Sequence, residues 1–297
     1  MDKKNKLRIT LATVVAVLLG VFGAVCTACA VALEYDEPMG YFKVDSVFAP
    51  ALYCAMAAAV IIGIVMWAMF FRTDLKDGEI LPVGAAEMIV FALAGLTIGA
   101  DTVVSITNGI SGKLDTAGYT GMMIASWFCG ILAAVSMFSN LMGDTFRRSG
   151  AYAILGFFPP IYFALRVLML YFDKSVAVNS QLKVMCQVSF ICLMLLFCAE
   201  SGMCAGRGRI LSRYIFVLIC TVGITGAVSL GCIASFAAGN AGFPINITSA
   251  AMTAILSAYA VLRLLSLGNL PVAGRQKKNS VVNRNAENTE PHLDSGD

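Results

Sequence analysis

Asp101 and Arg166 carry opposite charges inside long apolar stretches, where an ionisable side chain needs an explanation. A charge at the centre of a bilayer costs about 2.5–3.5 kcal/mol on the scale derived from membrane insertion. Asp101 lies about one turn, and Arg166 about six residues, before the end of its stretch. If both stretches run in the same direction across a membrane, the two charges have similar depths. They are a candidate ion pair or charged vestibule; the alternative is that each side chain snorkels separately to the headgroups.

Glu87 and Glu200 form a second candidate group. Each lies about a turn from the end of its apolar stretch, and Arg207 and Arg209 follow Glu200. We expect both carboxylates to reach water on the inner side of a membrane, as interfacial groups close to basic loops. The alternative hypothesis is a proton or cation relay that opens inward.

Two consecutive prolines, Pro159 and Pro160, lie within another apolar stretch. Proline lacks a backbone donor and crowds the carbonyl group four residues back, so the pair predicts a kink or an interruption. Carbonyl groups freed there must find other partners, and interrupted membrane helices often line binding sites. Asn140 and Gln187 are polar residues in neighbouring stretches, for which we expect hydrogen bonds between helices.

The sequence predicts no catalytic residues, no cofactor and no metal site. The only histidine, His292, lies in the polar C-terminal segment, which excludes histidine-dependent triads and the usual zinc motifs. Cysteines recur every six residues at Cys186, Cys192, Cys198 and Cys204. On a helix, six residues correspond to a rotation of about 240°, so these thiols point in different directions and cannot surround one ion.

The composition is that of a membrane protein, because 59% of the 297 residues are hydrophobic and 13% are charged. A transmembrane helix needs about 20 apolar residues, and eight stretches have that length. The sequence therefore predicts an all-α, polytopic integral membrane helix bundle with eight transmembrane helices. The stretches are 9–33, 50–71, 83–106, 121–142, 151–172, 182–204, 214–238 and 247–267.

The distribution of basic residues predicts the orientation of this bundle. Basic residues are retained on the cytoplasmic side, and they concentrate before the first stretch, in alternate connections and after the last stretch. These residues are Lys3, Lys4, Lys6, Arg8, Arg72, Lys76, Arg147, Arg148, Arg207, Arg209, Arg213, Arg263, Arg275, Lys277, Lys278 and Arg284. We therefore expect both termini on the cytoplasmic side of the plasma membrane, and the first helix is too long for a cleaved signal peptide. The net charge of +3 reflects these loops and indicates no nucleic-acid partner.

The predicted domain organisation is one transmembrane bundle, residues 1–270, followed by a disordered cytoplasmic tail, residues 271–297. Residues 1–148 and 149–270 each contain four stretches, so they are candidate halves of a 4+4 parallel repeat. Small residues at Gly95 and Gly99, and throughout residues 222–239, favour close packing of the third and seventh helices.

The leading functional hypothesis is a small-solute transporter or permease-like bundle. It depends on the eight stretches, the proline pair and the charges of matching depth. The alternative is a non-transporting membrane sensor, accessory subunit or scaffold that acts through a protein partner, and the scarcity of central charges favours it. An integral membrane enzyme is a third hypothesis. Apart from the lipid bilayer, the identity of the solute or partner is not encoded in any motif.

Overall fold

The computed structural model describes most of the chain and supports the membrane assignment. Described residues are 3–36, 41–71, 83–111, 119–143, 149–173, 179–204, 211–239 and 244–268, together with residues 146 and 177. The predicted tail, residues 271–297, lies outside the described residues. Within the described part, eight helical spans are long and apolar enough to cross a membrane, which confirms the eight predicted stretches and indicates a multi-pass membrane protein.

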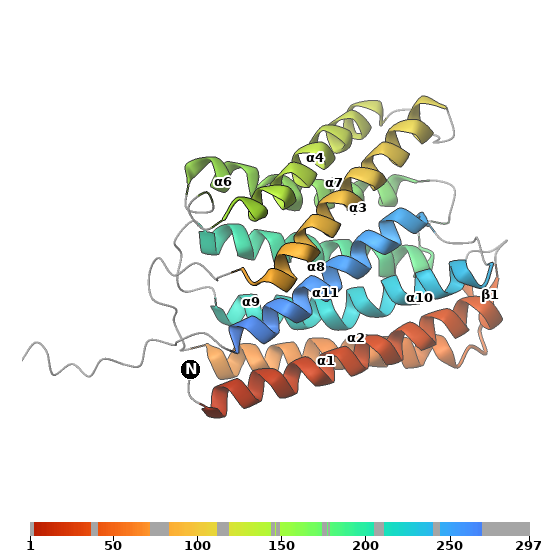
Figure 1. Cartoon of the computed structure of the whole chain (residues 1–297). Coiled ribbons are helices and arrows are strands. Elements are labelled where there is room, and N and C mark those ends of the chain that lie inside the picture. The colour runs from red at the N-terminus through yellow and green to blue at the C-terminus, as the bar shows by residue number, and fades with distance from the viewer. Residues whose placement is uncertain are drawn as a thin grey trace, which may run out of the picture.

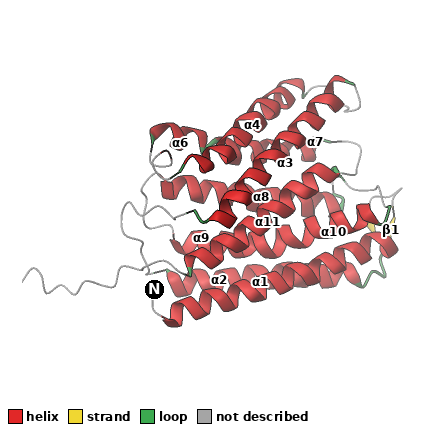
Figure 2. Ribbon diagram, in the orientation of Figure 1, coloured by secondary structure: helices red, strands yellow, loops and turns green. Residues whose placement is uncertain are grey.

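The described part is almost entirely helical (Figure 2). Its elements are α1 (Lys3–Cys29), η1 (Ala30–Glu34), β1 (Tyr35–Asp36), β2 (Tyr41–Phe42), α2 (Phe48–Phe70), α3 (Ala85–Ile110), α4 (Thr120–Ser139), η2 (Asn140–Met142), α6 (Gly150–Leu155), α7 (Phe158–Phe172), α8 (Gln181–Cys204), α9 (Leu211–Cys220), η4 (Thr221–Thr225), α10 (Gly226–Ala237) and α11 (Ile247–Leu267). The two short strands pair antiparallel, with Tyr35 opposite Phe42.

The fifth span is interrupted where the prolines predict it. α6 ends at Leu155, Gly156 and Phe157 form a turn, and α7 begins at Phe158. Pro159 and Pro160 therefore occupy the first turn of α7, where a helix has no use for the missing N–H groups. The freed carbonyl of Gly156 accepts a hydrogen bond from Ser201 Oγ on α8, at 2.6 Å.

The helices form a layered bundle (Figure 1), in which α1 and α2 lie on one side and α3, α4, α6 and α7 on the other. α9, α10, α11 and α8 lie between these groups. α1 packs against α2 and α10, α3 against α4 and α11, and α7 against α4 and α8. We call the end of the bundle where α1 begins and α11 ends the N-side end, and the opposite end the far end.

Close helix contacts in the centre depend on glycine. Within the seventh span, Leu211–Ala237, 89% of an 18-residue apolar stretch is buried, in agreement with the predicted close packing of this helix. A Cβ atom added at Gly223 would lie 2.4 Å from Ala59 Cβ on α2, so a larger residue does not fit there. The corresponding share in the third span is only 39%. In it, Gly95 packs against Phe138 but Gly99 faces open space, so only the first glycine of the pair makes a tight contact.

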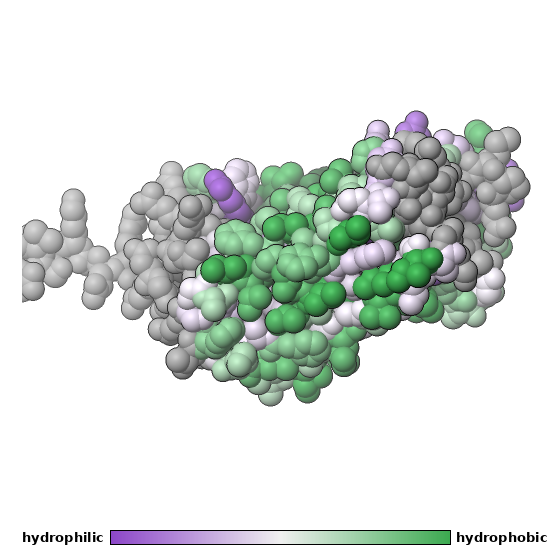
Figure 3. All heavy atoms as spheres, turned by 90° about the horizontal axis from the view of Figure 1, so that it is seen from above, coloured by the Kyte–Doolittle hydropathy of each residue, from purple (hydrophilic) through white to green (hydrophobic). Residues whose placement is uncertain are grey.

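The face of the bundle seen in Figure 3 is largely apolar. Large hydrophobic side chains are exposed on several spans, and examples are Leu11, Phe22, Ile61, Leu96 and Phe128. Such a surface is stable in contact with lipid and costly in water. The membrane orientation and the 4+4 repeat remain predictions.

Candidate functional site

Asp101 and Arg166 meet inside the far half of the bundle. Arg166 Nη2 on α7 lies 3.3 Å from Asp101 Oδ2 on α3, and the Asp101 side chain is fully buried. The predicted pairing is therefore confirmed, and the snorkelling alternative does not hold in this structure. Whether the pair serves a function remains a prediction.

Three hydroxyl groups complete the environment of the Asp101 carboxylate. Tyr162 donates to Oδ2 at 2.6 Å, and Ser249 and Thr248 donate to Oδ1 at 2.5 and 3.1 Å. Ser249 and Thr248 lie in the first turn of α11, which Asn246 caps by accepting from the Ser249 backbone N–H at 2.8 Å. The N-terminus of a helix favours a negative charge, so α11 stabilises the carboxylate in addition to the guanidinium.

The Arg166 guanidinium has fewer partners than the carboxylate. Its Nη2 also lies 2.6 Å from Ser249 Oγ, and the group lies 5.8 Å from the centre of the Phe190 ring. Its Nε is buried without a hydrogen-bond partner among the described residues. Arg166 therefore depends mainly on Asp101, whereas Asp101 has several other stabilising contacts.

A second buried ionic cluster lies near the N-side end and is centred on Arg263 of α11. Arg263 Nη1 lies 3.4 Å from Glu87 Oε1 on α3, and Arg263 Nε lies 3.4 Å from Glu200 Oε1 on α8. Tyr214 donates to Glu200 Oε1 at 2.7 Å, and Tyr259 also donates to that oxygen. Arg263 Nε donates to the Tyr259 hydroxyl at 2.6 Å. We call Glu87, Glu200, Arg263, Tyr214 and Tyr259 the Arg263 cluster.

The expectation that Glu87 and Glu200 are interfacial groups in contact with water is wrong for Glu87. Its side chain is 5% exposed, and it accepts a hydrogen bond from the Gly84 backbone N–H at 2.9 Å. Glu200 is also largely buried, with 15% of its side chain exposed. The physical reason is that Arg263 lies between the two carboxylates and offsets the cost of removing them from water.

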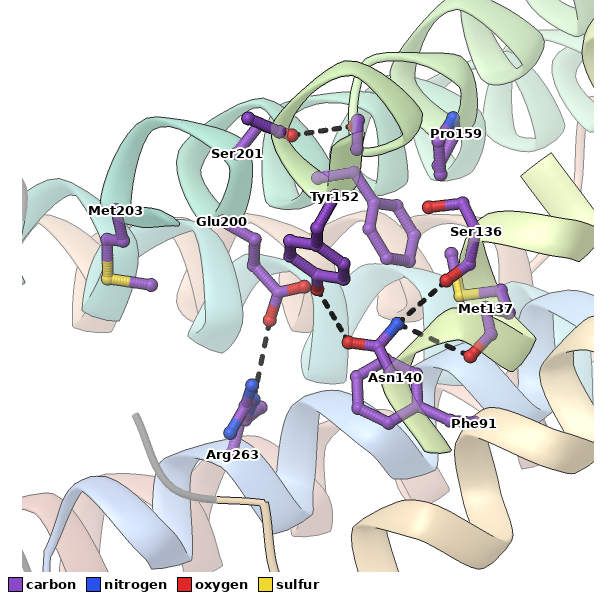
Figure 4. A pocket seen from close by; sticks show the side chains of 13 residues that line it. Phe91, Ser136, Met137, Asn140, Tyr152, Pro159, Glu200, Ser201, Met203 and Arg263 are labelled. Carbon is purple, nitrogen blue, oxygen red and sulfur yellow. Dashed lines mark hydrogen bonds and ion pairs between the residues drawn. The ribbon is translucent and has the colours of Figure 1, made fainter. Parts of the chain in front are cut away.

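The structure shows a partly enclosed cavity beside the Arg263 cluster (Figure 4). About 30 Å³ is open to the centres of water-sized spheres. Its lining comes from five spans and consists of Phe91, Ser136, Met137, Asn140, Tyr152, Ala153, Gly156, Pro159, Phe197, Glu200, Ser201, Met203 and Arg263. The interrupted fifth span thus contributes its turn and its first proline to the wall of a cavity.

The two predicted polar residues differ in their contacts. Asn140 Oδ1 accepts from the Tyr152 hydroxyl of α6 at 2.6 Å, which confirms the expected hydrogen bond between helices (Figure 4). The amide nitrogen of Gln187 is buried without a hydrogen-bond partner among the described residues. Gln187 does not line the cavity, so the structure brings Asn140, Pro159 and Glu200 together and leaves Gln187 apart.

Sequence reasoning missed several residues of both clusters. Arg263 was interpreted only as an orientation signal, and Tyr162, Tyr214, Tyr259, Thr248 and Ser249 were not singled out. The spacing of Tyr259 and Arg263, four residues apart in one span, was an available signal because such residues share a helix face. Their carboxylate partners lie on other helices, so the clusters depend on helix order in the bundle.

Within the described part of the chain, no group of three or more His, Cys, Asp or Glu residues could hold a metal ion. Comparison with protein-family models, with curated proteins and with solved structures found no match. Function is therefore inferred from the geometry of the chain itself.

Proposed function

We propose that this chain is a small-solute transporter of the plasma membrane, with its solute site in the cavity beside the Arg263 cluster. The observation that carries the proposal is the position of this cavity. It lies at an interruption in a membrane span and is lined by a carboxylate, a guanidinium, an amide and hydroxyl groups. Discontinuous helices with exposed backbone carbonyl groups are typical of binding sites in transporters.

The two ionic clusters support this proposal because they bridge the same helices at separate depths. Glu87 and Asp101 are 14 residues apart on α3, and Ser249 and Arg263 are 14 residues apart on α11. At 1.5 Å per residue each separation is roughly 21 Å, a large part of a hydrocarbon core about 30 Å thick. In the proposed mechanism, each cluster closes one end of the solute pathway.

Opening the N-side end would require Arg263 to separate from Glu87, because this pair joins α11 to α3. Opening the far end would require Arg166 to separate from Asp101, which joins α7 to α3, or the hydrogen bonds of Thr248 and Ser249 to Asp101 to break. Breaking a buried pair costs about 3–5 kcal/mol when one partner is lost. A solute can shift this equilibrium only through stronger contacts with the open state than with the closed state. We therefore expect the solute to compete for Glu200 or Arg263, which line the cavity.

The alternative is a membrane sensor or accessory subunit that does not transport. The small cavity, about 30 Å³, and the dense packing of the seventh span favour it. A direct test is uptake by proteoliposomes exposed to a mixture of isotopically labelled amines, amino acids and sugars. Transport predicts that at least one compound enters faster than in protein-free liposomes, and that Glu200→Ala abolishes this excess. Absence of any excess with correctly folded protein would support the alternative.

A further inference from the structure

The Arg263 cluster contains more negative than positive charge among the described residues. Two carboxylates, Glu87 and Glu200, share the single guanidinium of Arg263. Both Glu87 oxygens lie 3.4 Å from Arg263 Nη1, whereas Glu200 meets Arg263 through one contact of 3.4 Å to Nε. Arg263 thus contacts both carboxylates at similar distances. Its single positive charge cannot compensate both of them, so the cluster can accept a further cation.

The hydrogen bonds of Glu200 are concentrated on one of its oxygens. Tyr214, Tyr259 and Arg263 all contact Oε1, and none of these bonds involves Oε2. Figure 4 shows the Glu200 side chain pointing into the space between Tyr152 and Arg263. Glu200 is one of the residues that line the cavity. Its second oxygen is therefore available to a ligand there.

The walls of the cavity combine aromatic and polar groups with the Arg263 guanidinium, which lies 6.0 Å from the centre of the Phe91 ring. Aromatic rings of Phe91, Tyr152 and Phe197 contribute to the lining, beside the polar side chains of Asn140 and Ser201. Aromatic faces attract ammonium groups through their quadrupoles, and the attraction increases when water is excluded. A cavity must offer about 10–15 Å³ to hold one water molecule, so about 30 Å³ accommodates an ammonium group with a short substituent.

We propose that this cavity binds the ammonium group of a small primary amine, with Glu200 as its counter-ion. A primary alkylamine has a pKa near that of lysine, about 10.4, so it is a cation at pH 7. Its N–H groups can donate to Glu200 Oε2, and its short alkyl group can contact the aromatic walls. The identity of the solute as an amine rests on the proposed function, but the binding itself does not.

The binding experiment uses the purified full-length chain in detergent at pH 7. Methylammonium and ethylammonium chloride are titrated while thermal unfolding is followed, with sodium and potassium chloride at equal ionic strength and acetamide as an uncharged control. A ligand that binds only the folded protein stabilises it by RT ln(1 + [L]/Kd). We expect a concentration-dependent rise of the unfolding temperature with both amines and none with acetamide or the alkali salts. Equal effects of all cations, or no effect of the amines, would overturn the proposal.

Two variants test whether amine binding depends on Glu200. Glu200→Gln retains an oxygen that accepts from Tyr214 and Tyr259 but removes the charge, and we expect at least a tenfold loss of amine affinity. Asp45→Asn removes a carboxylate from an exposed position and should leave the affinity unchanged. If Glu200→Gln does not fold, the comparison of methylammonium with acetamide on the unmodified chain still decides whether the protein binds an ammonium group. Unchanged affinity in a folded Glu200→Gln variant would refute the assignment.

The amine site and the transport function can be refuted independently of each other. Saturable amine binding in detergent without amine uptake by proteoliposomes would retain the site and refute the transport proposal. Uptake of an uncharged solute, together with no effect of the amines on unfolding, would refute the amine site and retain transport.

Discussion

Neutralising either partner of the Asp101–Arg166 pair should destabilise the bundle, and loss of the aspartate should cost more than loss of the arginine. The effect of neutralising both should be smaller than the sum of the two single effects. The perturbations are Asp101→Asn, which preserves side-chain volume, Arg166→Gln, which shortens the side chain but keeps it polar, and the double variant. Asp101→Asn leaves the Arg166 guanidinium without its counter-ion, and Arg166 Nε already lacks a hydrogen-bond partner among the described residues. Arg166→Gln leaves the carboxylate with the hydroxyl groups of Tyr162, Thr248 and Ser249.

The magnitude follows from the separation of the charges. At 3.3 Å and an effective dielectric constant of about 20, Coulomb attraction amounts to about 5 kcal/mol. Removing one partner forfeits this attraction but also removes that partner's own desolvation cost, so the net loss is about 3–5 kcal/mol. We expect Asp101→Asn to reach this range and Arg166→Gln to cost less. The double variant should be more stable than Asp101→Asn, because no lone charge remains buried.

The free energy of unfolding can be measured by titration with sodium dodecyl sulfate in mixed micelles, followed by tryptophan fluorescence. Asp45→Asn and Arg213→Gln are matched controls, since they remove the same charges from exposed positions. A double-mutant cycle should give a coupling energy of about 2 kcal/mol or more. Additive losses would refute the reasoning, and so would a greater loss for Arg166→Gln than for Asp101→Asn.

Three other predictions address packing, the helix interruption and orientation. Gly223→Ala should destabilise by about 1–3 kcal/mol because it overpacks the contact with α2, whereas Gly99→Ala should be neutral or stabilising in the same unfolding titration. Alanine at both positions of Pro159–Pro160 should reduce solute uptake while expression and unfolding change little; unchanged uptake would exclude a mechanical role. On a cysteine-free background, Gly40→Cys should react with an impermeant thiol reagent from outside, and Arg209→Cys only after permeabilisation.

The fold could be predicted largely because the bilayer constrains it. A span must satisfy its backbone hydrogen bonds internally and exclude charge, so each helix leaves a long apolar stretch in the sequence. The interruption at Gly156 was equally accessible, because Pro159 and Pro160 act on their own helix. The Asp101–Arg166 ion pair was predictable because residue number within a span gives the depth of a side chain in the membrane. The two residues have similar depths, so they could be placed at the same level without knowledge of helix order.

The Arg263 cluster could not be predicted in the same way. Arg263 lies near the end of a span, where a basic residue also serves as an orientation signal, and both interpretations fit the sequence equally well. Its contacts with Glu87 and Glu200 require α11 to lie against α3 and near α8, and helix order is a property of side-chain packing. The polar partners of Asp101 were missed for the same reason, since Thr248 and Ser249 resemble the ordinary start of a helix.

The two buried carboxylates of α3 share a feature that relates stability to the proposed mechanism. Asp101 contacts the first turn of α11, and Glu87 lies in the first turn of α3 and accepts its Gly84 N–H. Both negative charges are therefore held at helix N-termini, which favour them independently of the arginines. When an arginine moves away, the carboxylate keeps its other polar contacts. Separation of the ion pair therefore costs less than the loss of all polar partners of the carboxylate. Such an arrangement permits Arg166 or Arg263 to be the moving partner, while α3 and its carboxylates remain fixed.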